Sequence, residues 1–196
     1  MARQFAVTWD YRCPFARNAH EAVVAGLREG RDWDVRFWPF SLDQVHVEEG
    51  ETPVWQRDLD ETGVGGVRAL LWGIAVRDAF GDKFLDFHVA AFRARHDEGK
   101  KIADEAVLRE VAAGVGLDPS AVAEEVASGR PLKALEAEHT EAVDRYAVFG
   151  VPTIIDGEEG AFVRMMERGN VDDFAHALEM MPSTRLNEFK RTRIPR

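Results

Sequence analysis

The stretch that decides the fold reads DYRCPFA, residues 10–16. It follows residues 5–9, an alternating run with aromatic and β-branched side chains, which predicts a short strand. Pro14 suits the first turn of a helix, where its missing N–H leaves no hydrogen bond unmade. Apolar side chains then recur at helical spacing as far as Leu27. Cys13 is therefore predicted to lie at the N-cap of a helix that begins at Pro14.

A second strand after this helix completes a βαβ unit. Residues 33–40 alternate apolar with polar side chains, and Pro39 closes the run. The order strand, helix, strand predicts two parallel strands joined by a right-handed crossover. Residues 43–66 are acidic and rich in turn-forming residues, so this stretch is expected to be a loop.

The middle of the chain is predicted to be helical, and strands return after it. Residues 67–148 carry five apolar runs at helical spacing, two of them preceded by the capping residues Asp104 and Asp118. Beyond them, residues 150–157 predict a turn that leads into a strand and ends in a second turn at Asp156–Gly157. Residues 161–165 predict a neighbouring strand, and residues 170–181 predict a last helix. The expected organisation is one domain from residues 1–62 and 149–196, with a helical insertion over residues 63–148.

Composition and charge exclude several classes of function. The chain has 196 residues, 45% of them hydrophobic, with a net charge of −10, so it lacks the general basic surface that binds nucleic acid. No apolar run approaches the roughly 20 residues that a membrane span requires. The first residues do not read as a secretory leader. We therefore expect a cytoplasmic protein with neither nucleic acid nor membrane as a partner; a homodimer is compatible with these observations.

Cys13 is the only cysteine, so its sulfur chemistry must be intermolecular. One thiol cannot supply the ligands of a structural zinc or iron–sulfur site, and no metal is expected. A thiol at a helix N-terminus lies near unpaired N–H groups, which favour the thiolate. Arg12 and Arg17, together with the helix start at Pro14, are predicted to stabilise that anion near neutral pH. The alternative interpretation is a buried cysteine that serves as a small hydrophobic side chain.

Residues 10–16 resemble the active-site turn of DsbA-like thioredoxin-fold proteins, and residues 150–153, GVPT, resemble their cis-proline loop. The helical insertion matches that of the family, so the resemblance covers nearly the whole chain. It implies an α/β, thioredoxin-like fold with an inserted all-helical subdomain. It also implies a cis Val151–Pro152 bond against Cys13, with the backbone N–H and C=O of Val151 free to pair with a bound thiol or peptide.

The start of the last helix offers a second place for a bound thiol. Its free N–H groups could hold a carboxylate, although an ordinary asparagine cap explains the same sequence. The residues expected to bind substrate or thiol are Phe15, Val151, Pro152, Thr153 and Asn170.

One position departs from the family motif. The usual motif is Cys-x-x-Cys, whereas Ala16 occupies the second cysteine's place, so the internal dithiol cycle cannot run. The resemblance then implies a monothiol oxidoreductase without a tightly bound cofactor. Cys13 would form a mixed disulfide, a sulfenic acid or a thioether with a small disulfide or electrophilic substrate. An external small thiol, mycothiol or glutathione, would resolve the reversible adducts as co-substrate.

Two other functions stay open. The turn is also similar to that of the kappa-class glutathione transferase and 2-hydroxychromene-2-carboxylate isomerase group. Residues 189–193 resemble the C-terminal segment of mycothiol-dependent oxidoreductases. Cys13 could therefore hold a bound glutathione or mycothiol in a transferase or isomerase. Alternatively, the chain could be a non-catalytic peptide-binding module.

Overall fold

A four-stranded mixed sheet forms one half of the molecule in the computed structural model, which describes residues 1–61 and 65–193. Its strands lie in the order β2 (Trp33–Pro39), β1 (Arg3–Trp9), β3 (Thr153–Asp156) and β4 (Glu159–Phe162). β1 is parallel to β2 and antiparallel to β3, which is antiparallel to β4. The predicted parallel βαβ unit is confirmed. The last strand, expected at residues 161–165, ends instead at Phe162.

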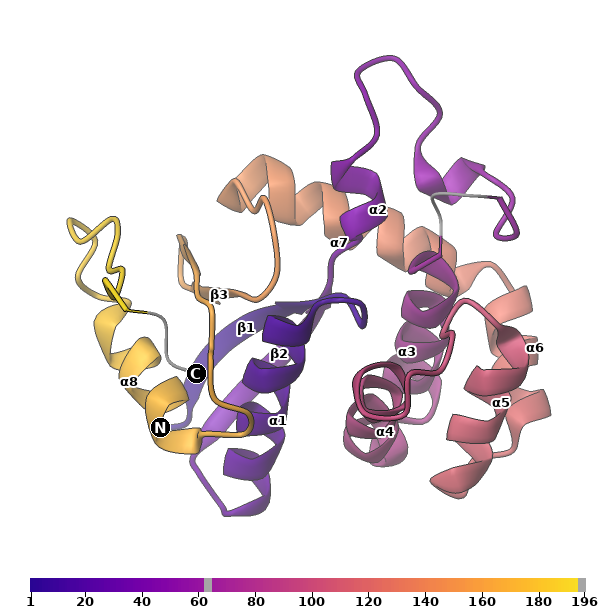
Figure 1. Cartoon of the computed structure of the whole chain (residues 1–196), viewed down its shortest axis with the longest axis horizontal. Helices are drawn as coiled ribbons and strands as arrows, with labels where there is room; N and C mark the ends of the chain where they lie inside the picture. The colour runs from indigo at the N-terminus through magenta and orange to yellow at the C-terminus, as the bar shows by residue number, and fades with distance from the viewer. Residues whose placement is uncertain (62–64, 194–196) are drawn as a thin grey trace.

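The helix α1 (Pro14–Arg28) connects β1 and β2 and lies between two other helices (Figure 1). On one side it packs against α8 (Val171–Met180), and on the other against α4 (Phe84–His96). The Phe174 ring of α8 packs on the Phe5 ring of β1, with centroids 5.6 Å apart. The N-terminus of α1 thus lies where the sheet meets the helical region.

The helical region consists of α3 (Val67–Ala79), α4, α5 (Glu105–Gly114), α6 (Pro119–Ala127) and α7 (Arg130–Tyr146), with a 3₁₀ turn at Gly81–Lys83. Asp104 and Asp118 cap α5 and α6 as predicted, each accepting a backbone N–H two residues further on. α3 comes close to the turn before α1, since a Cβ on Gly73 would lie 2.5 Å from the Tyr11 hydroxyl.

The expectation of a plain loop over residues 43–66 is wrong in two places. A short helix, α2 (Leu42–Val45), is capped by Ser41, whose hydroxyl accepts the Gln44 N–H at 3.2 Å. A 3₁₀ turn follows at Val54–Gln56. The domain boundary expected between residues 62 and 63 lies outside the described residues. None of the helices described is both long and apolar enough to span a membrane.

Candidate functional site

Cys13 lies in the turn between β1 and α1, against the loop that precedes β3. It caps α1, with its Sγ accepting the Ala16 N–H at 3.4 Å. The thiol donates to the carbonyl oxygen of Val151 at 3.2 Å, and the Val151–Pro152 peptide bond is cis. Cys13 is 9% exposed. Its sulfur is therefore held between a helix N-terminus and the proline loop, at the edge of solvent.

The proline loop is fixed by its own hydrogen bonds. The Thr153 N–H donates to the Thr8 hydroxyl at 2.8 Å, and the Thr153 hydroxyl donates to the Gly150 carbonyl at 2.8 Å. Thr153 is buried, so it supports the loop and presents no polar group to a partner. The C=O of Val151 is occupied by the thiol. Within the described residues, its N–H makes no hydrogen bond.

The protonation state of Cys13 differs from the expectation. Burial raises the pKa of the Cys13 thiol, and the Asp10 carboxylate raises it further. The backbone N–H groups of Ala16 and Phe15 act in the opposite direction, as does the charge of Arg164, but the net pKa shift is upward. The direction of this shift opposes the thiolate expected at neutral pH, and in this resting arrangement the thiol donates to the Val151 carbonyl.

Arg12 does not supply the cation that the sequence suggested. Its Nη1 lies 2.6 Å from Asp43 Oδ1, and its Nε lies 3.6 Å from Asp10 Oδ1. Pro14 is exposed at the first helical position, where it starts α1. Because two carboxylates compensate its charge, Arg12 fixes the turn instead of stabilising the sulfur anion.

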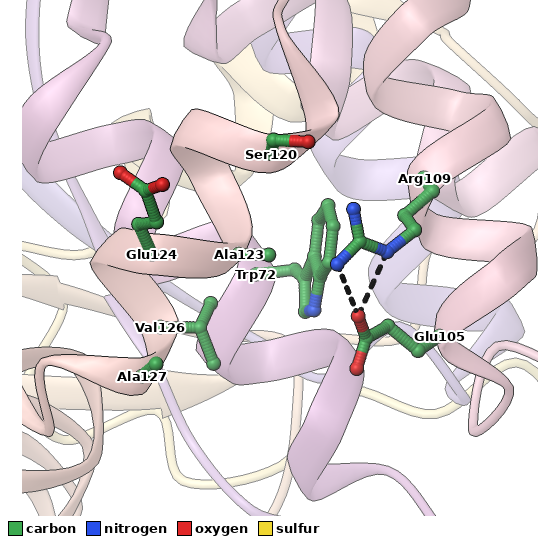
Figure 2. Close-up of a pocket in the computed structure, with 8 residues that line it drawn as sticks. All are labelled: Trp72, Glu105, Arg109, Ser120, Ala123, Glu124, Val126 and Ala127. Atoms are coloured by element: carbon green, nitrogen blue, oxygen red, sulfur yellow. Dashed lines mark hydrogen bonds and ion pairs between the residues drawn. The ribbon is translucent and has the colours of Figure 1, made fainter.

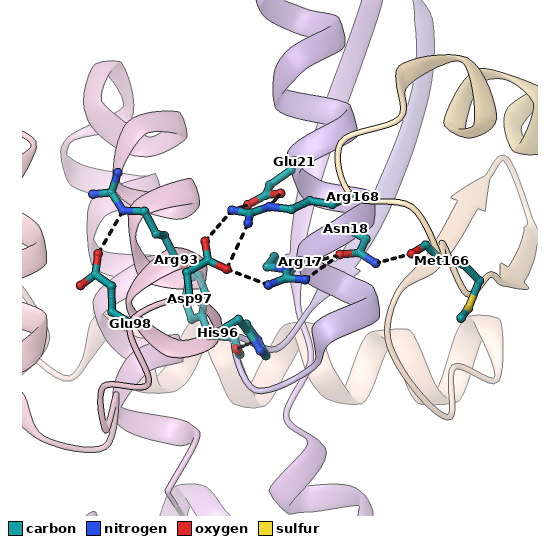
Figure 3. Close-up of polar contacts among 10 residues, drawn as sticks. Arg17, Asn18, Glu21, Arg93, His96, Asp97, Glu98, Met166 and Arg168 are labelled. Carbon is teal, nitrogen blue, oxygen red and sulfur yellow. Dashed lines mark hydrogen bonds and ion pairs between the residues drawn. The ribbon is translucent and has the colours of Figure 1, made fainter. Parts of the chain in front are cut away.

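Arg17 is likewise engaged elsewhere, in an ion-pair network between α1, the end of α4 and the loop before α8 (Figure 3). Its Nη1 lies 3.0 Å from Asp97, which also pairs with Arg168 at 2.7 Å. Arg168 pairs in turn with Glu21. On the same face, the Asn18 amide donates to the Met165 carbonyl at 2.8 Å. The network therefore holds the loop that follows β4 against α1.

Asp10 is a fully buried carboxylate close to the thiol, and the sequence interpretation missed it. Its two oxygens accept the backbone N–H groups of Arg12 and Leu42, each at 2.9 Å. Burial raises the pKa of Asp10, while the Arg12 cation and these two N–H donors oppose that shift. Asp10 therefore links the turn that carries Cys13, between β1 and α1, to the start of α2 through these two hydrogen bonds.

A chain of buried hydrogen bonds runs under the turn from Tyr11 to β1. The Tyr11 hydroxyl lies 2.9 Å from His88 Nδ1, His88 Nε2 lies 2.9 Å from His20 Nδ1, and His20 Nε2 lies 3.0 Å from the Thr8 carbonyl. A carbonyl only accepts, so His20 Nε2 donates; this makes His88 Nε2 a donor and Tyr11 a donor to His88. Both rings are neutral, in keeping with burial, which lowers the pKa of His20 to about 4.

The remaining expected residue, Asn170, serves as a helix cap. Its Oδ1 accepts the Asp173 N–H at 2.9 Å, and its amide donates to Glu167 at 3.0 Å. In the part of the chain described, its side chain hydrogen-bonds to none of the residues around Cys13. The structure thus brings Cys13, Val151 and Pro152 together. Arg12, Arg17, Thr153 and Asn170 take structural contacts.

Arg164, which the sequence analysis did not single out, lies beside the site. Its guanidinium carbon is 5.6 Å from the Phe15 ring centroid and 5.8 Å from that of Phe162. Phe162 also packs on Phe149, which is 67% exposed, at 5.1 Å between centroids. No pattern in the sequence distinguishes this arginine, because its position depends on how β4 meets the proline loop.

A hollow of about 420 Å³ lies elsewhere, on the helical region (Figure 2). Trp72, Arg109 and side chains of α6 line it, and Arg109 is already paired with Glu105 at 2.7 Å. It includes none of the residues around Cys13. Residues 1–61 and 65–193 contain no cluster of three potential metal ligands.

Comparisons with known proteins agree with this fold. The family model of the DSBA-like thioredoxin domain matches residues 6–179. Among solved structures, Pseudomonas aeruginosa DsbA is 21% identical with a TM-score of 0.60, covering 93% of this chain and 83% of its own. A 2-hydroxychromene-2-carboxylate isomerase is 19% identical with a TM-score of 0.65, covering 94% of this chain and 97% of its own.

A third similar structure is that of a putative protein disulfide isomerase from Nitrosomonas europaea. It is 13% identical with a TM-score of 0.63, and the match covers 94% of this chain and 99% of that one. The comparison with curated proteins gives no significant match. These structural similarities establish the fold, and the match over residues 6–179 establishes the family: the chain belongs to the DSBA-like thioredoxin domain family.

Proposed function

We propose that this protein is a monothiol oxidoreductase in which Cys13 exchanges with a disulfide and an external small thiol completes the cycle. The observation that carries the proposal is the position of the Cys13 sulfur, 3.4 Å from the Ala16 N–H and 3.2 Å from the Val151 carbonyl. A sulfur at a helix N-terminus, facing a backbone segment that can pair with a partner, suits thiol–disulfide exchange.

The first step converts the resting thiol into a nucleophile. The Cys13 S–H loses its proton to solvent, and the N–H groups of Ala16 and Phe15 favour the resulting anion. The thiolate attacks one sulfur of the substrate disulfide, so an S–S bond forms to Cys13 and the other sulfur leaves as a thiolate. Deprotonation also releases the Val151 carbonyl, which together with its N–H can then pair with the partner's backbone.

The second step needs a thiol from outside the chain. A small thiolate attacks the mixed disulfide, restores the Cys13 thiolate and leaves as a new disulfide with the substrate half. Glutathione and mycothiol are the candidate co-substrates. We place the reaction in the cytoplasm, where small thiols are kept reduced.

Intact mass measurement tests this proposal directly, because the chain has one cysteine. Incubation with oxidised glutathione, and separately with oxidised mycothiol, is expected to add one small-thiol unit, which excess reduced thiol removes. The Cys13→Ser variant is expected to gain no mass, and it serves as the matched control. An unmodified wild-type protein after long incubation with both disulfides contradicts the oxidoreductase function.

A second candidate rests on the protonated state of the thiol. Burial raises the pKa of Cys13, and a neutral S–H can donate a hydrogen bond to a bound small thiol without exchanging with it. The protein would then be a glutathione- or mycothiol-dependent transferase or isomerase. In that case Cys13→Ser, which keeps a donor, retains turnover, whereas Cys13→Ala loses it. The absence of both adduct and turnover would favour the third function, a non-catalytic peptide-binding module.

A further inference from the structure

We propose that Arg164 is a specificity residue that binds a carboxylate of the small disulfide or thiol reacting with Cys13. The inference rests on the proposed function and names its substrate class. It is carried by three observations on Arg164: its fixed backbone, its unpaired charge and its aromatic surroundings.

The backbone on both sides of Arg164 is fastened to the elements that hold the sulfur. The Val163 N–H donates to the Pro152 carbonyl at 3.1 Å, and the Met165 carbonyl accepts from the Asn18 amide at 2.8 Å. Pro152 belongs to the loop against Cys13, and Asn18 lies in α1, the helix that Cys13 caps. The ion pairs of Arg168 with Glu21 and Asp97 fix the same loop further on (Figure 3). Arg164 therefore has a defined place relative to the thiol.

The charge of Arg164 is available, unlike those of its neighbours. Arg12, Arg17 and Arg168 each pair with carboxylates of the chain. Arg164 is exposed, and within the described residues it meets no carboxylate, although acidic residues outnumber basic ones by 35 to 25. Its charge also acts on the Cys13 sulfur, favouring the thiolate. An arginine left unpaired at this point can accept an anion from outside.

The rings around Arg164 favour this role. Phe15 and Phe162 lie near the guanidinium, 5.6 and 5.8 Å from its central carbon to the ring centroids. Aromatic neighbours orient the planar group while leaving its N–H edge free for a bidentate contact with a carboxylate. Substrates with a carboxylate near the sulfur should therefore react faster than neutral ones.

A matched set of small disulfides tests the inference. Dithiodipropionate is anionic, hydroxyethyl disulfide is neutral and cystamine is cationic, while all three have short aliphatic arms. Rates of Cys13 modification are measured by mass spectrometry for the wild type, Arg164→Gln and Arg164→Lys. Arg185→Gln is the control, since Arg185 is exposed and removing it changes the net charge equally.

The wild type is expected to react faster with the anionic disulfide than with the neutral one. Arg164→Gln should lower this ratio about ten-fold, the size expected for losing a hydrogen bond to a charged group. Arg164→Lys should restore part of the ratio, and Arg185→Gln should leave it unchanged. If Arg164→Gln slows all three disulfides by the same factor, the arginine acts only on the sulfur, and the inference is overturned.

A binding measurement separates this inference from the proposed function. Calorimetry with the Cys13→Ser variant and dithiodipropionate needs no exchange reaction. Binding that is lost in the double variant Cys13→Ser/Arg164→Gln supports carboxylate recognition even if the wild type fails to react with any disulfide. Equal binding by both variants refutes recognition, whatever the reactivity of Cys13.

Discussion

Ala16 is the residue that separates this chain from a dithiol protein. It is buried in the first turn of α1, and its N–H points at the Cys13 sulfur, 3.4 Å away. Side chains three residues apart on a helix have Cβ atoms about 5–6 Å apart, and a small adjustment at the helix start brings them within disulfide range. We predict that Ala16→Cys forms an intramolecular disulfide with Cys13 on mild oxidation. The intact mass should then fall by two hydrogens, and neither cysteine should react with an alkylating reagent.

Ala19→Cys is the matched control for this substitution. Ala19 is also a buried alanine of α1, but it lies six residues beyond Cys13. That separation is about 9 Å along a helix axis, too far for a disulfide. If Ala16→Cys stays fully reduced under conditions that glutathionylate the wild type, the first turn of α1 does not have the geometry described here.

The effect of Asp10 on the pKa of the Cys13 thiol can be tested with a single substitution. Burial is its main cause, and the Asp10 carboxylate adds to it. Asp10→Asn removes the negative charge, so the midpoint of alkylation rate against pH should move to lower pH. Asp86→Asn, an exposed acid paired with Arg28, makes the same change in net charge and should leave the midpoint in place. An unchanged midpoint in Asp10→Asn would show that the carboxylate does not act on the thiol.

At the scale of elements, the row of hydrogen bonds from Tyr11 through His88 to His20 connects α4 to α1 and to the turn that carries Cys13. His88→Leu leaves the Tyr11 hydroxyl and His20 Nδ1 buried without partners, and each orphaned group costs about 1–3 kcal/mol. The two groups together should lower the free energy of unfolding by about 2–6 kcal/mol, measured by urea denaturation. Tyr11→Phe should cost less, and the double variant should cost less than the two single losses added. If the losses in free energy of unfolding were additive, Tyr11 and His88 would not be part of one connected hydrogen-bond network.

The sequence predicted the elements better than their contacts. The βαβ unit, the N-cap at Cys13 and the caps at Asp104 and Asp118 follow from local patterns, and the structure confirms them. The partners of the charged and buried polar side chains could not be predicted from local sequence patterns. Arg12 pairs with Asp43, and His88 reaches His20 across 68 positions of sequence. Such pairs depend on how the helical region packs on the sheet, which no local spacing encodes.

On the scale of the whole molecule, the sheet and the helical region are joined by polar contacts as well as by apolar packing. Arg77 of α3 donates to the Phe37 carbonyl of β2 at 2.9 Å and pairs with Glu138 of α7. Asp97 at the end of α4 bridges Arg17 and Arg168. The turn that carries Cys13 contacts both halves, because Tyr11 hydrogen-bonds to His88 of α4 and Cys13 hydrogen-bonds to Val151 beside the sheet. Its geometry therefore depends on the two halves remaining docked.

Buried histidines make this docked state sensitive to acid. Burial lowers the pKa of His20 and of His139 to about 4 each, and lowers that of His88 well below its usual value. In the unfolded chain these rings take up protons near pH 6.5, so the unfolded state gains protons first as pH falls. The stability that the neutral, buried histidines contribute to the folded state is therefore complete above pH 6.5, and it is lost progressively as the pH falls toward 4. Between pH 7 and pH 5 each ring should remove about 2 kcal/mol from the free energy of unfolding.

One variant isolates this effect. His139 accepts the Ser41 N–H at 3.2 Å, and His139→Gln keeps an acceptor without a titrating ring. Asp10, whose pKa is raised, opposes the histidines by gaining stability as pH falls, but it does so equally in both proteins. Urea denaturation at pH 7 and pH 5 should therefore show a drop smaller by about 2 kcal/mol in His139→Gln than in the wild type. Identical drops in the two proteins would mean that His139 is protonated while the chain is folded, and that the packing of α7 against residues 38–41 is looser than the structure indicates.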